Sequence, residues 1–204
     1  MTNRHAFKPW GLATAIGSMP HRDPDEACAL VSRYLPDIPV WPQLPRRSPL
    51  ESMYAQYSRG FPGVQTRDDR VWIERSEETI DGLARLFADA ETEAIDGYAL
   101  TPDYAAGLAR FLDVKWQSPP VAVKGQLIGP VSWGLTVTDQ DRRSILYDDT
   151  LAEAVAQVLR LQAMWQELAL GAVSPRTILF LDEPYLSAFG SAVVPLSREQ
   201  AVAL

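Results

Sequence analysis

The chain has 204 residues, of which 47% are hydrophobic and 22% are charged, which is ordinary for one soluble globular domain with a sizeable core. The formal net charge of −7 argues against a nucleic-acid-binding protein, which would carry a basic face. No segment approaches the roughly 20 consecutive apolar residues of a membrane span, and the polar start leads into no apolar signal segment. We therefore expect a cytoplasmic protein that contacts neither a membrane nor nucleic acid. The sole cysteine, Cys28, permits no intrachain disulfide and is interpreted as a small core residue.

The first part of the chain predicts two strands, one helix and a hairpin. An apolar strand over residues 12–20 ends in a Gly-Ser turn, and Asp23-Pro24 then opens a helix to about residue 35. A second short strand, 38–41, stops at Pro42-Gln43-Leu44-Pro45. Residues 64–67 and 70–74 flank Asp68-Asp69 and predict a hairpin.

The second part alternates helices and buried strands. Helices are predicted over about 76–90, 102–112 and 148–170, the last with an apolar stripe that indicates core packing. The apolar runs 121–130 and 178–181 predict strands buried on both faces, as parallel strands covered by helices are. Ser197 and Gln200 form a capping box at the start of a final short helix.

Three predicted strands end in Gly, Ser, Asp or Pro, which is typical of one rim of a β/α barrel with a small-molecule site. We count four β/α units, whereas a closed (β/α)8 TIM barrel needs eight and typically about 250 residues. We therefore expect residues 1–204 to form a single α/β domain, roughly the first half of a TIM barrel, truncated at its C-terminus or paired with a second copy as a homodimer. Either arrangement predicts an exposed apolar sheet edge.

Three motifs resemble, in order and at similar spacing, the catalytic domain of cobalamin-independent methionine synthase. They are Ile16-Gly17-Ser18, the run from Val123 to Val131, and Leu181-Asp182-Glu183-Pro184. The resemblance spans about residues 12–190 and is sharp only in these motifs. The wider group of barrels includes uroporphyrinogen decarboxylase and the corrinoid-protein methyltransferases. Because the family's large N-terminal half has no counterpart here, the chain is most similar to the short, core-type synthases.

The resemblance implies an S-methyltransferase of methionine biosynthesis that methylates the thiol of homocysteine. Its Ile-Gly-Ser turn holds the amino-acid end of homocysteine, which maps to Ile16, Gly17 and Ser18. A glycine allows close backbone approach, and a neighbouring N–H with a serine hydroxyl binds a carboxylate. The aspartate that takes the substrate's ammonium group maps to Asp182, a carboxylate at a strand end.

The sequence also departs from the family pattern. A glutamate of the second-strand motif is replaced, so that Gln43 is the substrate-binding candidate there. The family's tryptophan that stacks on a folate donor falls near Thr136, and its glutamate shortly after Asp-Glu-Pro falls near Ala188. Trp133 is either a shifted substitute for that tryptophan or a packing residue. The methyl donor is therefore left open between methylfolate and a methylated corrinoid protein.

The family activates the homocysteine thiol on zinc through ligands downstream of Asp-Glu-Pro. His5, His21 and Cys28 lack the spacing of these ligands, so this chain alone should bind no zinc and be inactive as a methyltransferase. Two alternatives stay open. One is a corrinoid-protein-linked methyltransferase acting on another thiol, and the other is a non-catalytic, amino-acid-binding domain of the same fold.

Overall fold

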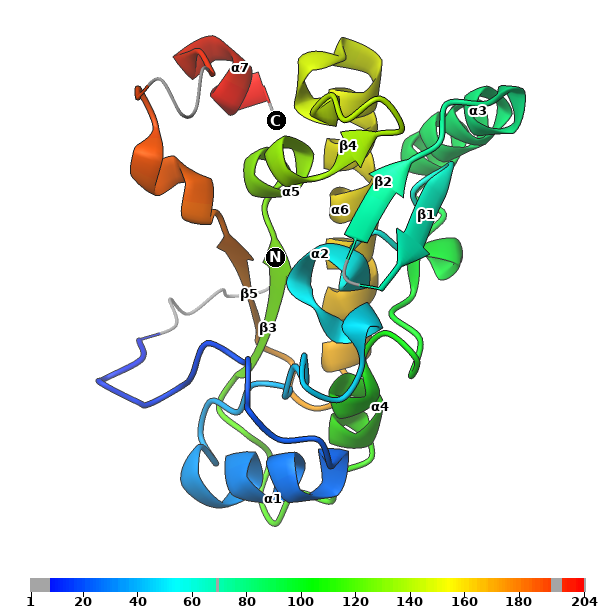
Figure 1. The fold of residues 1–204 in the computed structure, drawn as a ribbon. Helices are drawn as coiled ribbons and strands as arrows, with labels where there is room; N and C mark the ends of the chain where they lie inside the picture. Colours follow the sequence, from blue (N-terminus) through cyan, green and yellow to red (C-terminus); the bar gives the residue numbers. More distant parts are fainter. Residues whose placement is uncertain (1–7, 69, 192–195, 204) are drawn as a thin grey trace.

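The computed structural model describes residues 8–68, 70–191 and 196–203, which form a mixed α/β fold (Figure 1). The α-helices are α1 (Pro24–Tyr34), α2 (Met53–Gln56), α3 (Glu77–Thr92), α4 (Ala106–Leu112), α5 (Pro130–Thr136), α6 (Asp149–Leu170) and α7 (Arg198–Ala203). Single 3-10 turns are η1 (Pro49–Glu51), η2 (Asp96–Tyr98), η3 (Ile145–Tyr147) and η4 (Pro184–Ala188). The strands are β1 (Val64–Arg67), β2 (Arg70–Ile73), β3 (Val123–Ile128), β4 (Thr138–Asp139) and β5 (Thr177–Asp182).

Local capping explains where the predicted helices begin. Asp23 accepts a hydrogen bond from Asp25 N at 2.8 Å, and Asp148 caps α6 by accepting from Leu151 N at 3.1 Å. The capping box at Ser197 is confirmed, since its hydroxyl accepts from Gln200 N and its own N–H donates to the Gln200 side chain. The helix predicted over 102–112 begins later, at Ala106, and α2 and α5 were not predicted.

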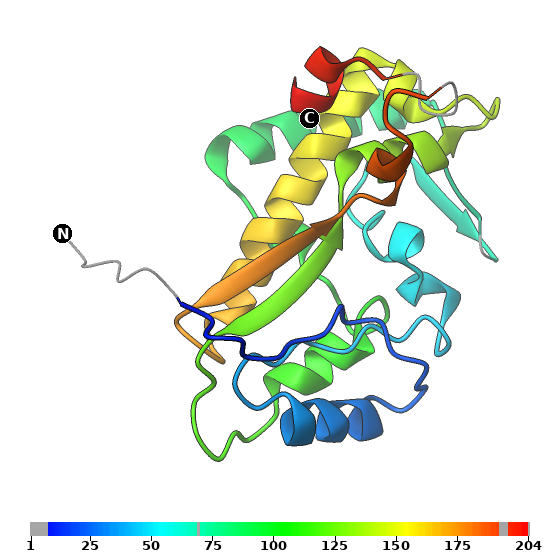
Figure 2. The same ribbon diagram turned by 90° about the vertical axis from the view of Figure 1, so that its left-hand side faces the viewer.

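Four extended segments lie next to one another in chain order, all parallel. β3 and β5 pair over six residues, from Val123 opposite Thr177 to Ile128 opposite Asp182. On the other side of β3, Val40 bridges to Lys124, and Ser18 in turn bridges to Gln43. Figure 2 shows β3 and β5 side by side against α6. Within the described residues the ladders form one sheet of two strands and one of three, so the fold established here is mixed α/β.

The first two predicted strands are less regular than expected. Each makes only a single bridge to its neighbour instead of a continuous ladder. Pro39 and Pro42 have no N–H to donate, and Gly17 has a φ of +126°, outside the extended region. Both features interrupt strand pairing on either side of the bridges.

The predicted hairpin is confirmed. β1 and β2 pair antiparallel from Val64 opposite Ile73 to Arg67 opposite Arg70, and β2 also pairs in parallel with the two-residue β4. Asp68 enters the turn with a φ of +53°, and the predicted turn residue Asp69 lies outside the described residues. This small sheet is separate from the parallel segments that carry the sequence motifs.

A side chain of α6 fills the seam where the second segment diverges from β3. Gln166 Nε2 donates to the Gln126 carbonyl at 3.1 Å, and Gln166 Oε1 accepts from Gln126 N at 3.1 Å. The same oxygen accepts from Trp41 Nε1 at 2.7 Å, and the Tyr57 hydroxyl also donates to the Gln126 carbonyl. The Gln166 amide thus takes the hydrogen bonds that a neighbouring strand would make.

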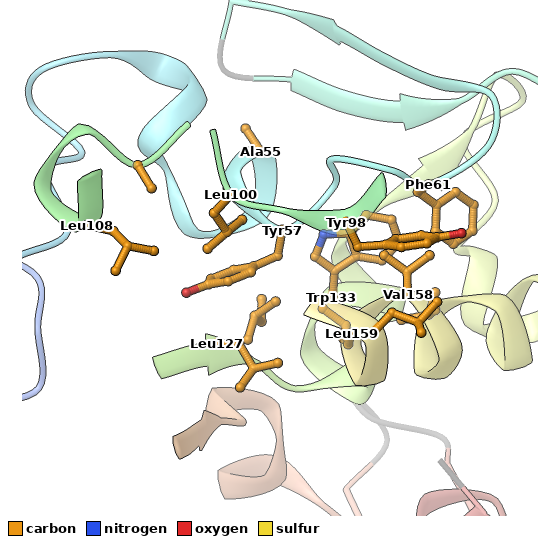
Figure 3. Close-up of a cluster of buried hydrophobic side chains, with 14 of the residues drawn as sticks. Ala55, Tyr57, Phe61, Tyr98, Leu100, Leu108, Leu127, Trp133, Val158 and Leu159 are labelled. Atoms are coloured by element: carbon orange, nitrogen blue, oxygen red, sulfur yellow. The ribbon is translucent and has the colours of Figure 1, made fainter. Parts of the chain in front are cut away.

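The hydrophobic core lies between β3, α6 and the helices that follow the hairpin. Figure 3 shows Tyr57, Trp133 and Leu127 packed with Val158 and Leu159 of α6. The prediction that residues 178–181 form a strand buried on both faces is wrong in its burial: none of the six residues of β5 is buried, and Phe180 is 41% and Leu181 58% exposed. Among the described helices, none is both long enough and apolar enough to cross a membrane.

The Cys28 thiol should react slowly in the native protein. Its side chain is 2% exposed, and burial raises its pKa to about 12, with Arg110 lowering and Asp25 raising it by smaller amounts. Because the thiolate is the nucleophile, we expect alkylation by iodoacetamide at pH 8 to be at least about 100-fold slower than for a free thiol. Time-resolved mass spectrometry measures this rate, and denatured protein serves as the control. A native rate equal to that of glutathione would contradict the burial of this thiol.

Candidate functional site

The Ile16–Ser18 turn leaves polar groups available at the first of the parallel segments. Gly17 O accepts from Gln43 N, and Met19 N donates to Gln43 O, both at 2.9 Å. The N–H groups of Gly17 and Ser18 and the Ser18 hydroxyl have no hydrogen-bond partner among the described residues. Ser18 is exposed and Gly17 is buried, so the Ser18 N–H and hydroxyl are the donors that are open to a small anionic group.

Only glycine fits at position 17. Its φ of +126° lies in the region that L side chains rarely adopt. A Cβ placed there would also lie 2.5 Å from Gln126 Nε2, well inside contact distance. The close approach of this turn to the Gln126 side chain joins the first motif to the second.

Lys124 on β3 contacts the same turn. Its ammonium nitrogen donates to the Ile16 carbonyl at 2.7 Å and lies 4.3 Å from the centroid of the Phe180 ring on β5. Burial lowers the pKa of Lys124 to about 8, while the charge of Asp182 raises it. The lysine is therefore a buried cation shared by the first and last of the four segments.

Asp182 is at the carboxyl end of β5, opposite Ile128 of β3. It is half-buried, and its carboxylate has no hydrogen bond or ion pair among the described residues. Its negative charge raises the pKa of Lys124. The pKa of the buried Tyr57 is also raised, mainly by burial and further by the charge of Asp182. An acidic group with free acceptor capacity, close to a cation, suits the ammonium end of an amino acid.

Glu183 has a different role from its neighbour. Its carboxylate accepts from Val131 N at 2.9 Å, Ser132 N at 2.7 Å and the Ser132 hydroxyl at 2.6 Å. These groups form the first turn of α5, so Glu183 caps this helix and ties it to the end of β5. A Cβ at Gly129 would lie 2.1 Å from Glu183 Oε1, which explains the glycine of the Gly-Pro pair. Sequence patterns alone did not distinguish this structural glutamate from the adjacent aspartate.

Gln43 occupies the predicted register position but its side chain is engaged elsewhere. The amide nitrogen donates to Gln56 Oε1 at 2.8 Å and to the Glu51 carbonyl at 3.5 Å, and the residue is 7% exposed. Its backbone rather than its side chain supports the Ile16–Ser18 turn. Gln43 as a substrate ligand stays a prediction.

The three positions where the sequence analysis placed contacts to a folate donor differ in burial. Trp133 is 1% exposed, its indole N–H donates to the Tyr54 carbonyl at 2.9 Å, and its ring packs on Phe61. It is a core residue in this structure and offers no free face for stacking. Thr136 is exposed at the end of α5, and Ala188 is half-buried in η4.

The hollow beside the turn is apolar. It has a volume of about 270 Å³ and lies between residues 15–19 and α1, with Leu30, Val31 and Tyr34 in its wall. Asp182 and β3 do not line it. The three motifs therefore lie on the first, third and fourth of the parallel segments, and Lys124 and Gln126 of β3 contact the first motif, but the motifs do not share this hollow.

The described residues do not fit a zinc site. No group of three or more His, Cys, Asp or Glu side chains among them is arranged to hold a metal ion. Cys28 is buried, with its thiol directed to the Gly107 carbonyl, and His5 lies outside the described residues.

The comparisons with known proteins found no matching family model, no matching curated protein and no matching solved structure.

Proposed function

We propose that this chain binds the amino-acid end of homocysteine and presents its thiol for S-methylation, as a methionine synthase-like methyltransferase. The observation that carries the proposal is the pairing of opposite polar groups. The Ile16–Ser18 turn, on the first parallel segment, offers unpartnered N–H and hydroxyl donors. Asp182, at the end of β5, offers a carboxylate without a hydrogen bond among the described residues. Donors for a carboxylate and an acceptor for an ammonium group are what an α-amino acid requires.

For the fold we propose the first half of a (β/α)8 barrel. Support comes from four parallel segments that neighbour one another in chain order, with α6 packed behind β3 and β5. Exposed apolar side chains on both outer segments, Ile16 at 64% and Leu181 at 58%, suit further strands beside them. These strands would come from additional chain or from a second copy in a homodimer.

In the proposed reaction the homocysteine sulfur attacks the methyl group of a donor, and the donor departs with the electron pair of its broken bond. The residues described here bind and orient the amino acid. Deprotonation of the thiol is assigned to groups other than these residues. The donor is methylfolate or a methylated corrinoid protein, and the buried Trp133 weakens the case for a stacked pterin.

Asp182→Asn should weaken homocysteine binding by about 1.5–3 kcal/mol, because it removes a charge-assisted hydrogen bond to the ammonium group. Isothermal titration calorimetry with L-homocysteine and L-methionine measures the loss. Asp141→Asn is the matched control, since Asp141 is exposed on the loop after β4. Equal losses for the two variants would count against the ammonium site.

Turnover separates the open alternatives. Methyl transfer to homocysteine from methylfolate or from a methylated corrinoid protein supports the synthase, and transfer only to another thiol supports the corrinoid-linked alternative. Amino-acid binding with no turnover in the longest natural form of the chain supports the non-catalytic domain. If neither homocysteine, methionine nor any other amino acid binds, the proposal is wrong.

A further inference from the structure

Lys124 lies where a lysine is unfavourable. It is 1% exposed, on a strand whose six residues are all buried. An ammonium group has three N–H donors, and within the described residues only the Ile16 carbonyl accepts one of them. No carboxylate of the described part of the chain is within ion-pair distance of its nitrogen. The Phe180 ring and the charge of Asp182, which lies beyond ion-pair distance, already favour this cation, and an anion that arrives with a ligand would stabilise it further.

The hydrogen bond to the Ile16 carbonyl places the positive charge of Lys124 beside the turn whose N–H and hydroxyl groups are the candidate donors to a carboxylate. The Ile16 carbonyl and the Gly17 N–H belong to one peptide group, so a cation on the carbonyl polarises the N–H and strengthens it as a donor. The Phe180 ring, 4.3 Å from the nitrogen, limits the positions that the ammonium group can take. The side-chain amide of Gln126 packs against the same turn at Gly17.

Resting on the proposed function, we infer that Lys124 is the residue that selects a ligand with a carboxylate. It acts through the Ile16–Ser18 turn as a positioning residue, by fixing the turn and by providing the positive charge that balances the ligand's carboxylate. Asp182 then balances the ligand's ammonium group, so the two charges of the site match the two charges of a zwitterion. The substrate class that follows is a free α-amino acid rather than an amine or a simple thiol.

The test compares two thiols that differ only in the carboxylate, L-homocysteine and 3-mercaptopropylamine. Calorimetry on the unchanged protein should show homocysteine bound at least about tenfold more tightly, because only it uses the positive charge. Lys124→Met should weaken homocysteine by about tenfold or more and change 3-mercaptopropylamine by less than about twofold. Lys124→Arg, which keeps the charge, should restore most of the preference.

Lys115→Met is the matched control, because Lys115 is an exposed lysine and its loss should leave both affinities unchanged. If Lys124→Met weakens both ligands equally and Lys124→Arg does not restore binding, the lysine is only a structural support and the inference is wrong. Should Lys124→Met fail to fold, the ligand pair on the unchanged protein decides: equal affinities overturn the inference while leaving the proposed function standing. If neither ligand binds, both are wrong.

Discussion

Gln166→Leu is expected to lower the free energy of unfolding by about 2–4 kcal/mol, because it leaves buried polar groups without partners. Trp41 Nε1 and Gln126 N both donate to Gln166 Oε1, and all three residues are at most 2% exposed. Leucine has a similar volume, so a cavity does not account for the loss. Urea denaturation followed by circular dichroism measures it.

Gln157→Leu makes the same chemical change on the same helix and is the control. Gln157 is half-buried and its side chain has no hydrogen bond among the described residues, so its replacement should change stability by less than about 0.5 kcal/mol. Equal effects of the two substitutions would show that the seam beside β3 does not depend on the Gln166 amide.

Glu183→Ala is the second large expected effect, also about 2–4 kcal/mol in the free energy of unfolding. The carboxylate accepts three hydrogen bonds at the start of α5, two from backbone N–H groups and one from the Ser132 hydroxyl. Its removal uncaps α5 and releases the link between that helix and the end of β5. Thermal denaturation and hydrogen exchange at Val131 and Ser132 report the two consequences separately.

Glu91→Ala on α3 removes an exposed glutamate without a partner among the described residues, and it should be nearly neutral. A melting temperature for Glu183→Ala within experimental error of that for Glu91→Ala would contradict the capping role. Slow exchange of the Ser132 amide in Glu183→Ala would do so as well.

The sequence by itself determined the local elements of this protein. Asp23, Asp148 and Ser197 cap helices through partners two or three residues away, and the hairpin β1–β2 joins neighbouring residues. Such interactions depend on short-range chemistry, which is visible in the chain without knowledge of the fold. The parallel pairing expected of the two apolar runs also appears in β3 and β5, although only β3 is buried.

Only the tertiary structure decided which polar residues of the motifs support the fold and which stay available. Glu183 and Asp182 are adjacent in sequence, yet the Glu183 carboxylate caps α5, about 50 residues earlier, whereas the Asp182 carboxylate has no hydrogen bond or ion pair among the described residues. Gln166 meets Trp41 across 125 residues, and Lys124 meets Ile16 across 108. Partners this distant are chosen by the packing of β3, β5 and α6 as a unit, because each buried polar group must find its hydrogen bonds in whatever the whole fold places beside it.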